Sequence, residues 1–230
     1  MIQKGTNKPF NQYHLNALYG VLNERYWDID LHTAAKTKEC DAFIHILHEG
    51  RYPENAIALF DRGFESYNLF AHRIEKKQKF AVRVKDMTIN GMLSSINLPE
   101  GEWDQDITII LTRKQTNEVK NQPDKYKYIA YTTIFDFLDY RNEYYEITLR
   151  IVRFKIAEGV YECLVTNLSR DEMTFESMKE LYHLRWNEET SFRALKYNIG
   201  LVHFSFKEKS IYPAGDLCEA DHVQSIQGNR

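Results

Sequence analysis

The sequence predicts a mixed α/β fold for a chain of 230 residues. Three observations lead to this prediction: a composition typical of folded proteins, an alternation between strand-like and helix-like periods, and one long helical pattern toward the carboxyl end. Hydrophobic residues make up 43% of the chain and charged residues 27%, which is typical of a protein with a buried core. The length allows one large domain or two small ones.

The amino-terminal third is expected to alternate between strands and helices. Its first two runs indicate an antiparallel hairpin, because the second run alternates polar and apolar side chains with period two. Apolar residues then recur at helical spacing, and a short apolar run follows that is typical of a strand buried on both faces. The expected elements are strands at 13–22 and 25–32, a helix at 36–49, a strand at 56–60, a helix at 65–78 and a strand at 80–84.

Residues 86–170 differ from the segments before them. Polar turns separate several strand-like runs there, and no obvious helix interrupts them. The runs are 103–112, 126–133, 144–156 and 160–168. The segment 175–199 contains no Pro or Gly and is expected to be one long helix, with Asp171 or Thr174 as its cap and Gly200 at its end.

Composition argues against several classes of protein. No apolar run approaches the ~18 residues of a membrane span, and the first residues lack the apolar region of a signal peptide. Three widely separated cysteines, Cys40, Cys163 and Cys218, favour neither a disulfide framework nor a zinc site. A net charge of -3 argues against a uniformly basic surface. We therefore expect a cytoplasmic protein without a membrane partner.

One segment is strongly basic, although the net charge of the chain is slightly negative. Residues 62–85 contain seven Lys and Arg against two Glu, with no Asp. Such a cluster predicts either a local basic groove or the solvated face of a helix, and the sequence leaves both interpretations open.

One side of the long helix carries polar side chains of several kinds. The row consists of Tyr182, Arg185, Glu189 and Lys196. At about 100° per residue, the row falls within a sector of about 60° beside an apolar stripe. Glu188 falls inside that stripe, so Glu189 is the better candidate for a working carboxylate. A carboxylate can bind Mg²⁺, and the other side chains can contact phosphates and bases. The alternative is a solvated face with an ordinary Arg185–Glu189 ion pair.

The spacing of this row resembles the Y-(2)-R-(3)-E-(6)-K signature of DDE transposases from bacterial insertion sequences, in the insertion-sequence-four group. Other segments resemble the same family, and the likeness extends from about Tyr13 to Phe204. They include YHLNALYGVLNERY, ALFDRGFESYNLFAHRIEKK, ILTRKQTNEVK, FDFLD and LRIVRFK.

The resemblance implies an organisation for the chain. Residues 1–85 would form the first part of a ribonuclease-H-like core, residues 86–170 a β-rich insertion, and residues 171–204 the catalytic helix region of the core. The first core strand of the family and its amino-terminal DNA-recognition region have no match, so we expect a core that lacks its first strand. Residues 205–230 would be a divergent tail, whose irregular pattern resembles a shifted reading frame.

The resemblance also implies a site of three acids that bind two Mg²⁺ or Mn²⁺ ions in the complete enzyme. Asp61 matches the second acid and Glu189 the third, so both would be catalytic and metal-binding. Asp61 follows a predicted buried strand, where open sheets often build sites, although an ordinary turn aspartate fits the same place. The expected DNA contacts are Tyr182, Arg185, Lys196 and, in a lesser role, Arg62.

The first acid of the family has no counterpart. In the family it precedes the segment that matches Tyr13, and residues 1–12 contain no Asp or Glu. Asp28 and Asp30 lie too far along the chain to replace it. We therefore expect a transposase fragment. The family reaction is metal-dependent cleavage of DNA at transposon ends followed by strand transfer, and this chain is expected to be inactive alone.

Two other interpretations remain open. In one, the chain binds transposon ends or full-length transposase without catalysis and inhibits transposition; in the other, it is a decayed remnant without a stable fold. The expected partners are transposon-end and target DNA, with full-length transposase or a second copy on DNA as candidate protein partners, and the expected location is the nucleoid. A metal site at His45 and His48 has only their i,i+3 spacing in its favour.

Overall fold

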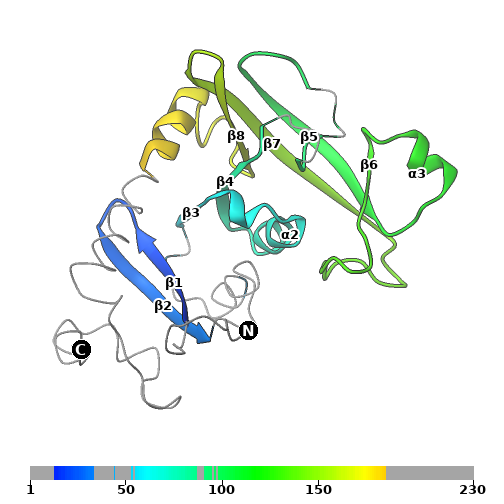
Figure 1. The fold of residues 1–230 in the computed structure, drawn as a ribbon, viewed down its shortest axis with the longest axis horizontal. Coiled ribbons are helices and arrows are strands. Elements are labelled where there is room, and N and C mark those ends of the chain that lie inside the picture. The colour runs from blue at the N-terminus through cyan, green and yellow to red at the C-terminus, as the bar shows by residue number, and fades with distance from the viewer. Residues whose placement is uncertain are drawn as a thin grey trace, which may run out of the picture. The chain divides into compact units, whose positions relative to one another are not determined.

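The structure is a computed structural model that describes residues 13–33, 44, 53, 55–86, 91–94, 96 and 98–184 (Figure 1). The chain divides into two compact units. One combines Met1–Pro53 with Tyr182–Arg230, and the other is the continuous segment Glu54–Leu181. The first unit contains a two-stranded sheet and the second a six-stranded sheet with helices. The prediction of a mixed α/β fold is therefore confirmed.

The first unit contains the predicted hairpin. β1 (Tyr13–Gly20) pairs antiparallel with β2 (Arg25–Thr33), and residues 21–24 form the turn. Glu24 has a φ of 53°, the left-handed conformation that tight hairpin turns require. On β2, Asp28 and Ile29 are both buried, and the Ile29 amide donates to Oδ1 of Asp28 at 2.9 Å.

Several predicted elements lie outside the described residues. These are the helix at 36–49 apart from Ile44, which is helical, the long helix beyond residue 184, and the tail at 205–230. His45 and His48 lie outside the described residues as well.

The second unit is built on one mixed sheet with the strand order β3-β4-β8-β7-β5-β6. The strands are β3 (Ile57–Phe60), β4 (Lys79–Val84), β5 (Trp103–Thr112), β6 (Tyr126–Tyr128), β7 (Tyr144–Ala157) and β8 (Val160–Thr166). β3 and β4 are parallel, whereas β4 and β8 are antiparallel. The strands of the β-rich block thus continue the sheet that β3 and β4 begin (Figure 1).

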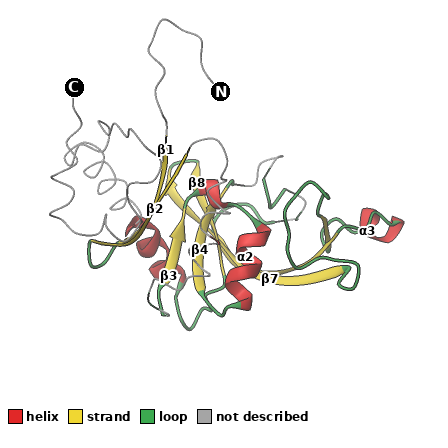
Figure 2. Cartoon of the chain, turned by 90° about the horizontal axis from the view of Figure 1, so that it is seen from below, coloured by secondary structure: helices red, strands yellow, loops and turns green. Residues whose placement is uncertain are grey.

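The helix α2 (Tyr67–Glu75) connects β3 to β4, as expected for a parallel pair. It begins at Ser66, whose Oγ accepts the Leu69 amide at 3.5 Å. Leu69 and Phe70 are fully buried, and the Phe70 ring stacks on Phe80 of β4 with centroids 5.2 Å apart. Figure 2 shows α2 beside this part of the sheet. The predicted helix and the strand after it are confirmed.

β3 is less buried than its sequence predicts. Phe60 is buried, whereas residues 57–59 are half-buried. In the described part of the chain β3 is an edge strand, with β4 as its neighbour in the sheet. The expectation of burial on both faces is therefore wrong for most of this strand, because an apolar run of four residues is also compatible with an edge position.

The β-rich block contains the predicted strands and one helix that the sequence did not predict. β5, β7 and β8 match their predicted runs closely, whereas β6 ends at Tyr128. The helix α3 (Asn117–Asn121) begins at Thr116, whose Oγ1 accepts the Val119 amide at 3.3 Å. Five residues are too few to show a helical period, which explains why the pattern missed it.

The long helix begins where Thr174 was expected to cap it. Residues 175–184 are helical, and Oγ1 of Thr174 accepts the Ser177 amide at 3.2 Å. None of the helices in the described residues has the length and apolar character of a membrane span.

Candidate active site

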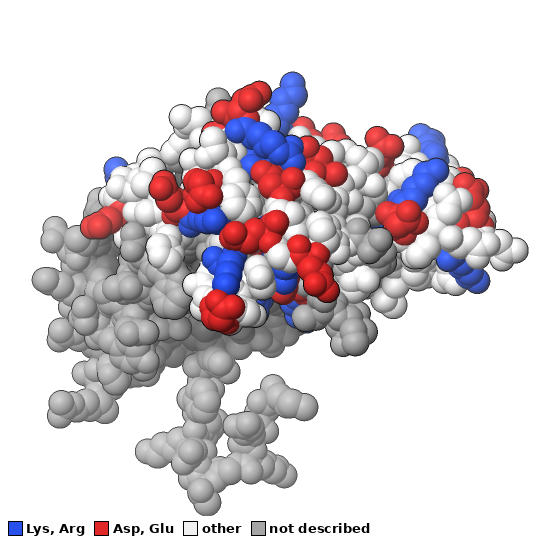
Figure 3. Space-filling model, turned by 90° about the horizontal axis from the view of Figure 1, so that it is seen from above, with Lys and Arg blue, Asp and Glu red and all other residues white. Residues whose placement is uncertain are grey.

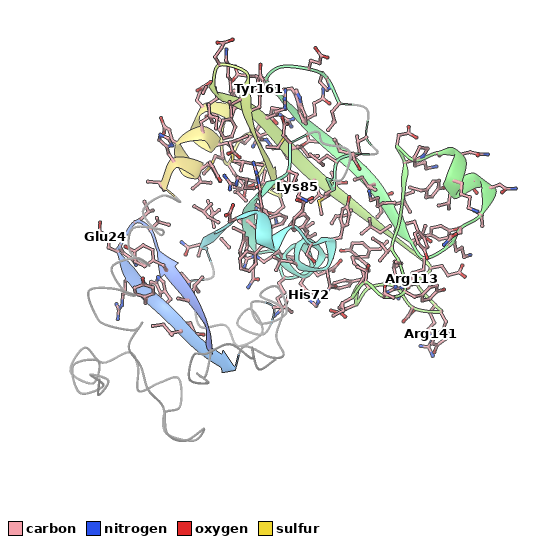
Figure 4. All side chains as sticks on the ribbon, in the orientation of Figure 1. Glu24, His72, Lys85, Arg113, Arg141 and Tyr161 are labelled. Carbon is pink, nitrogen blue, oxygen red and sulfur yellow. The ribbon has the colours of Figure 1, made fainter. Side chains whose placement is uncertain are left out.

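Asp61 directly follows β3, at the carboxyl end of the strand. Its backbone carbonyl accepts the Phe64 amide at 3.0 Å and so closes the short 3₁₀ helix η1 (Arg62–Phe64). Its side chain makes no capping hydrogen bond and is 44% exposed. Because β3 and β4 are parallel, Asp61 lies at the same edge of the sheet as the end of β4, which Lys85 marks in Figure 4.

A guanidinium holds the Asp61 carboxylate. Arg83 lies on β4 and donates from Nε to Oδ1 of Asp61 at 2.8 Å. The same guanidinium donates from Nη1 to Oε1 of Glu162, on β8, at 3.1 Å. Nη2 of Arg62 lies 3.6 Å from the other oxygen of Glu162. Two acids and two cations, from β4, β8 and the segment Asp61–Arg62 after β3, thus form one charged network around Asp61.

The basic run at 62–85 is largely paired within the protein. Arg73 is fully buried and donates to the carbonyl of Lys79 at 2.5 Å. The Lys79 ammonium lies 2.7 Å from Glu172. Four of the seven basic side chains, those of Arg62, Arg73, Lys79 and Arg83, therefore have partners within the protein. Figure 3 shows one face of the molecule, on which basic and acidic side chains are mixed.

The predicted row on the long helix is described only at its first member. Tyr182 is buried, with 7% of its surface exposed. Arg185, Glu189 and Lys196 lie outside the described residues. Arg62, the remaining predicted DNA contact, has a side chain that is 43% exposed.

Asp61 has properties that suit a divalent metal. Its carboxylate is half exposed, and carboxylate oxygens are the ligands that Mg²⁺ prefers. The described residues contain no group of three or more His, Cys, Asp or Glu side chains placed to bind a metal. The sequence predicts Glu189 as a second acid, and Glu189 lies outside the described residues.

The sequence predicts Asp61 as a site residue but not its contact with Arg83 or the contact of Arg83 with Glu162. The available signal was a charged residue inside each of two otherwise apolar strands, FAVRV and YECLV. A charge in a buried strand must find a partner, so each of these residues could have been marked as half of a buried pair. The identity of the partner depends on the register between strands, and local sequence patterns do not determine that register.

Asp61 is thus a half-exposed carboxylate at the end of a strand in a mixed α/β unit. A comparison with protein-family models matches residues 2–210 to the family described as transposase DDE domain. The match covers most of the chain, and the chain therefore belongs to this family. Members act on DNA and generally use divalent metals. A comparison with curated protein sequences finds no match.

Proposed function

We propose that the chain takes part in DNA transposition, through the chemistry of a DDE transposase of the insertion-sequence-four group. The observation that carries this proposal is Asp61, an accessible carboxylate at the end of β3 in a chain that belongs to the DDE family. The parallel β3–α2–β4 unit supports a ribonuclease-H-like core. The boundaries at residues 85 and 170 remain predictions, as does residence in the cytoplasm near the nucleoid.

Each predicted side chain has a role in this proposal. Asp61 and Glu189 hold the divalent ions, which would stabilise the attacking and leaving oxygens of an in-line displacement. Arg185 and Lys196 bind DNA phosphates. Tyr182 is the weakest of these assignments, since its ring is buried and would have to be uncovered to reach DNA.

Arg62 has a more limited part in the proposal. Its side chain is accessible, but its charge is shared with Glu162. We therefore expect Arg62 to contribute less to DNA binding than an unpaired arginine would.

A second candidate function is DNA binding without turnover. Of the three family acids, two are matched by residues of this sequence, Asp61 and Glu189. A chain of this kind can occupy transposon ends, or a full-length transposase on DNA, and inhibit transposition.

One experiment tests both candidates. The 230-residue chain is mixed with duplex DNA that ends in the terminal inverted repeat flanking its gene, with Mg²⁺ or Mn²⁺, and both binding and nicking are measured. We expect salt-sensitive binding without nicking. Arg185→Ala and Lys196→Ala should weaken binding, whereas Glu189→Ala should not.

The controls separate the outcomes. Glu158→Gln removes a carboxylate whose side chain is 96% exposed, and it should change neither readout. Robust nicking that Asp61→Ala abolishes, while Glu158→Gln does not, would refute the inactivity of the chain. Both candidate functions would be refuted if DNA binding did not depend on the sequence of the repeat, on the salt concentration or on Arg185.

A further inference from the structure

Glu162 is a buried carboxylate that no predicted role accounts for. It lies on β8 with 7% of its surface exposed, and its Oε2 accepts no hydrogen bond in the described part of the chain. A buried carboxylate is costly unless it is paired, so its cationic neighbours decide what it does. These neighbours are Arg83, at 3.1 Å from Oε1, and Arg62, at 3.6 Å from Oε2.

The register of the sheet brings Glu162, Arg83 and Asp61 to one face. The parallel ladder of β3 with β4 ends at the pair Phe60–Val82, so the next step places Asp61 beside Arg83. In the antiparallel ladder of β4 with β8, Glu162 lies diagonal to Arg83 on the same face. The β-rich block therefore contributes a side chain to the surroundings of Asp61.

Arg83 is shared between the two carboxylates. Its Nε donates to Asp61 at 2.8 Å and its Nη1 to Glu162 at 3.1 Å, so two edges of a rigid planar group are engaged. The Glu162 side chain is 9% exposed and the Asp61 side chain 44% exposed. The anchoring end of the contact is shielded from water, whereas the end at Asp61 is accessible to a ligand from solvent.

We propose that Arg83 is a positioning residue for Asp61, and that Glu162 sets how strongly Arg83 holds the Asp61 carboxylate. The proposal rests on the proposed function, in which Asp61 is a metal ligand. Because Arg83 also pairs with Glu162, its attraction to Asp61 is weaker than that of an arginine with one partner. The contact therefore orients the Asp61 carboxylate and still allows it to bind a cation.

This arrangement predicts opposite effects for two substitutions. Glu162→Gln keeps the shape but removes a negative charge, which leaves more of the Arg83 charge to Asp61 and weakens divalent binding. Arg83→Gln removes the competing cation and strengthens divalent binding. We expect each change to be about threefold, the factor that corresponds to a partly exposed ion pair. If Arg83 and Glu162 only supported the fold, both substitutions would weaken divalent binding.

The first test observes the contact itself. The full chain is labelled with ¹⁵N, and the Nε–H signal of Arg83 is assigned by its absence in Arg83→Lys. We expect slow exchange with water, and a shift of this signal in both Asp61→Asn and Glu162→Gln. Glu158→Gln is the matched control, because its side chain is 96% exposed. A signal that Glu162→Gln does not move overturns the proposal, whatever the metal does.

The second test measures Mn²⁺ binding by the electron paramagnetic resonance of the free ion. Opposite effects of Glu162→Gln and Arg83→Gln support the proposal, and equal losses in both overturn it. Arg83→Lys keeps the charge and separates loss of the guanidinium from loss of folding. If Asp61→Asn leaves Mn²⁺ binding unchanged while the Arg83 signal still responds to Glu162→Gln, the positioning contact stands and the metal role of Asp61 fails.

Discussion

At the scale of single residues, Arg150 shows how the β-rich block holds the start of the long helix. Its side chain, on β7, is 2% exposed and donates twice to the Asp104 carboxylate, at 2.9 and 2.7 Å. Its Nη1 donates to the carbonyls of Leu168, Ser169 and Met173. These carbonyls belong to the segment that precedes the helix at 175–184. Tyr182, the first member of the predicted row of functional side chains, lies on this helix.

Replacing Arg150 should therefore destabilise the second unit strongly. We expect Arg150→Met to lower the free energy of unfolding by about 3–5 kcal/mol, because it leaves several carbonyls without their donor and the Asp104 carboxylate with Arg170 in place of two cations. Urea unfolding followed by circular dichroism measures the change. Arg141→Met is the control, since Arg141 is exposed and its guanidinium lies over the ring of Tyr140, 5.1 Å from the ring centroid. A loss below about 1 kcal/mol for Arg150→Met would contradict the assignment.

A second prediction at this scale concerns pH. The ammonium of Lys79 and the amide of Ser169 donate to Glu172 and lower the pKa of its carboxyl from 4.5 to about 2. A carboxyl with a lowered pKa in the folded state stabilises the protein above its unfolded pKa and loses this effect as pH falls toward the folded value.

The stability difference between the wild-type chain and Glu172→Gln should therefore depend on pH. It should be present at pH 7 and disappear between pH 4.5 and about 2. Because the side chain is 41% exposed, we expect a difference of about 0.2–1 kcal/mol. Unfolding curves across this range check it, with Glu158→Gln as the control. A difference that grows as pH falls would show that the Lys79 contact does not form.

At the scale of elements, local patterns predicted most strands and their order but, apart from the first hairpin, not their partners. The strand predicted at 25–32 and the helix predicted after Thr174 depend on residues close together in the sequence, and the structure contains both. The pairing of β4 with β8 joins residues about 80 positions apart, and no local period contains it. The contact of Arg83 with Asp61 depends on strand register for the same reason, so the sequence pointed to Asp61 and Arg62 in this network but not to Arg83 or Glu162.

The end of α2 gives a prediction for one helix terminus. Lys77 has a φ of 56°, and its amide donates to the Ile74 carbonyl at 2.9 Å. The next amide, of Gln78, donates to the Arg73 carbonyl at 2.8 Å. These two bonds define a Schellman motif, in which the residue with positive φ is most often glycine.

Lys77→Gly should therefore stabilise the second unit. Glycine adopts this conformation without the steric cost of a Cβ, and we expect a gain of about 0.5–1 kcal/mol. The midpoint of urea unfolding measures it. Lys77→Ala retains the Cβ and should change stability little, which separates the backbone effect from loss of the charge. If both variants behaved alike, the left-handed conformation would not be the cause.

At the scale of the whole molecule, the sheet of the second unit is the main structural finding. The β-rich block was expected to be an insertion between two parts of the core. In the structure its strands and those of β3 and β4 form one sheet, all within Glu54–Leu181. The buried side chains of this sheet include Leu111, Ile151 and Leu164, which lie on three different strands of the block. A shared sheet and core make this segment a candidate for a single cooperative unit.

We therefore predict that residues 54–181, expressed by themselves, fold and melt in one cooperative transition. The six strands and the helix α2 that covers β4 are all included, so the hydrogen bonds of the sheet are retained. Thermal melting followed by circular dichroism should coincide with melting followed by Trp103 fluorescence, since Trp103 is buried on β5. The same segment with Leu164→Asp is the control and should not melt cooperatively. Two separate transitions would show that β3, α2 and β4 fold independently of the β-rich block, and a broad transition without a baseline would favour the interpretation of the chain as a remnant without a stable fold.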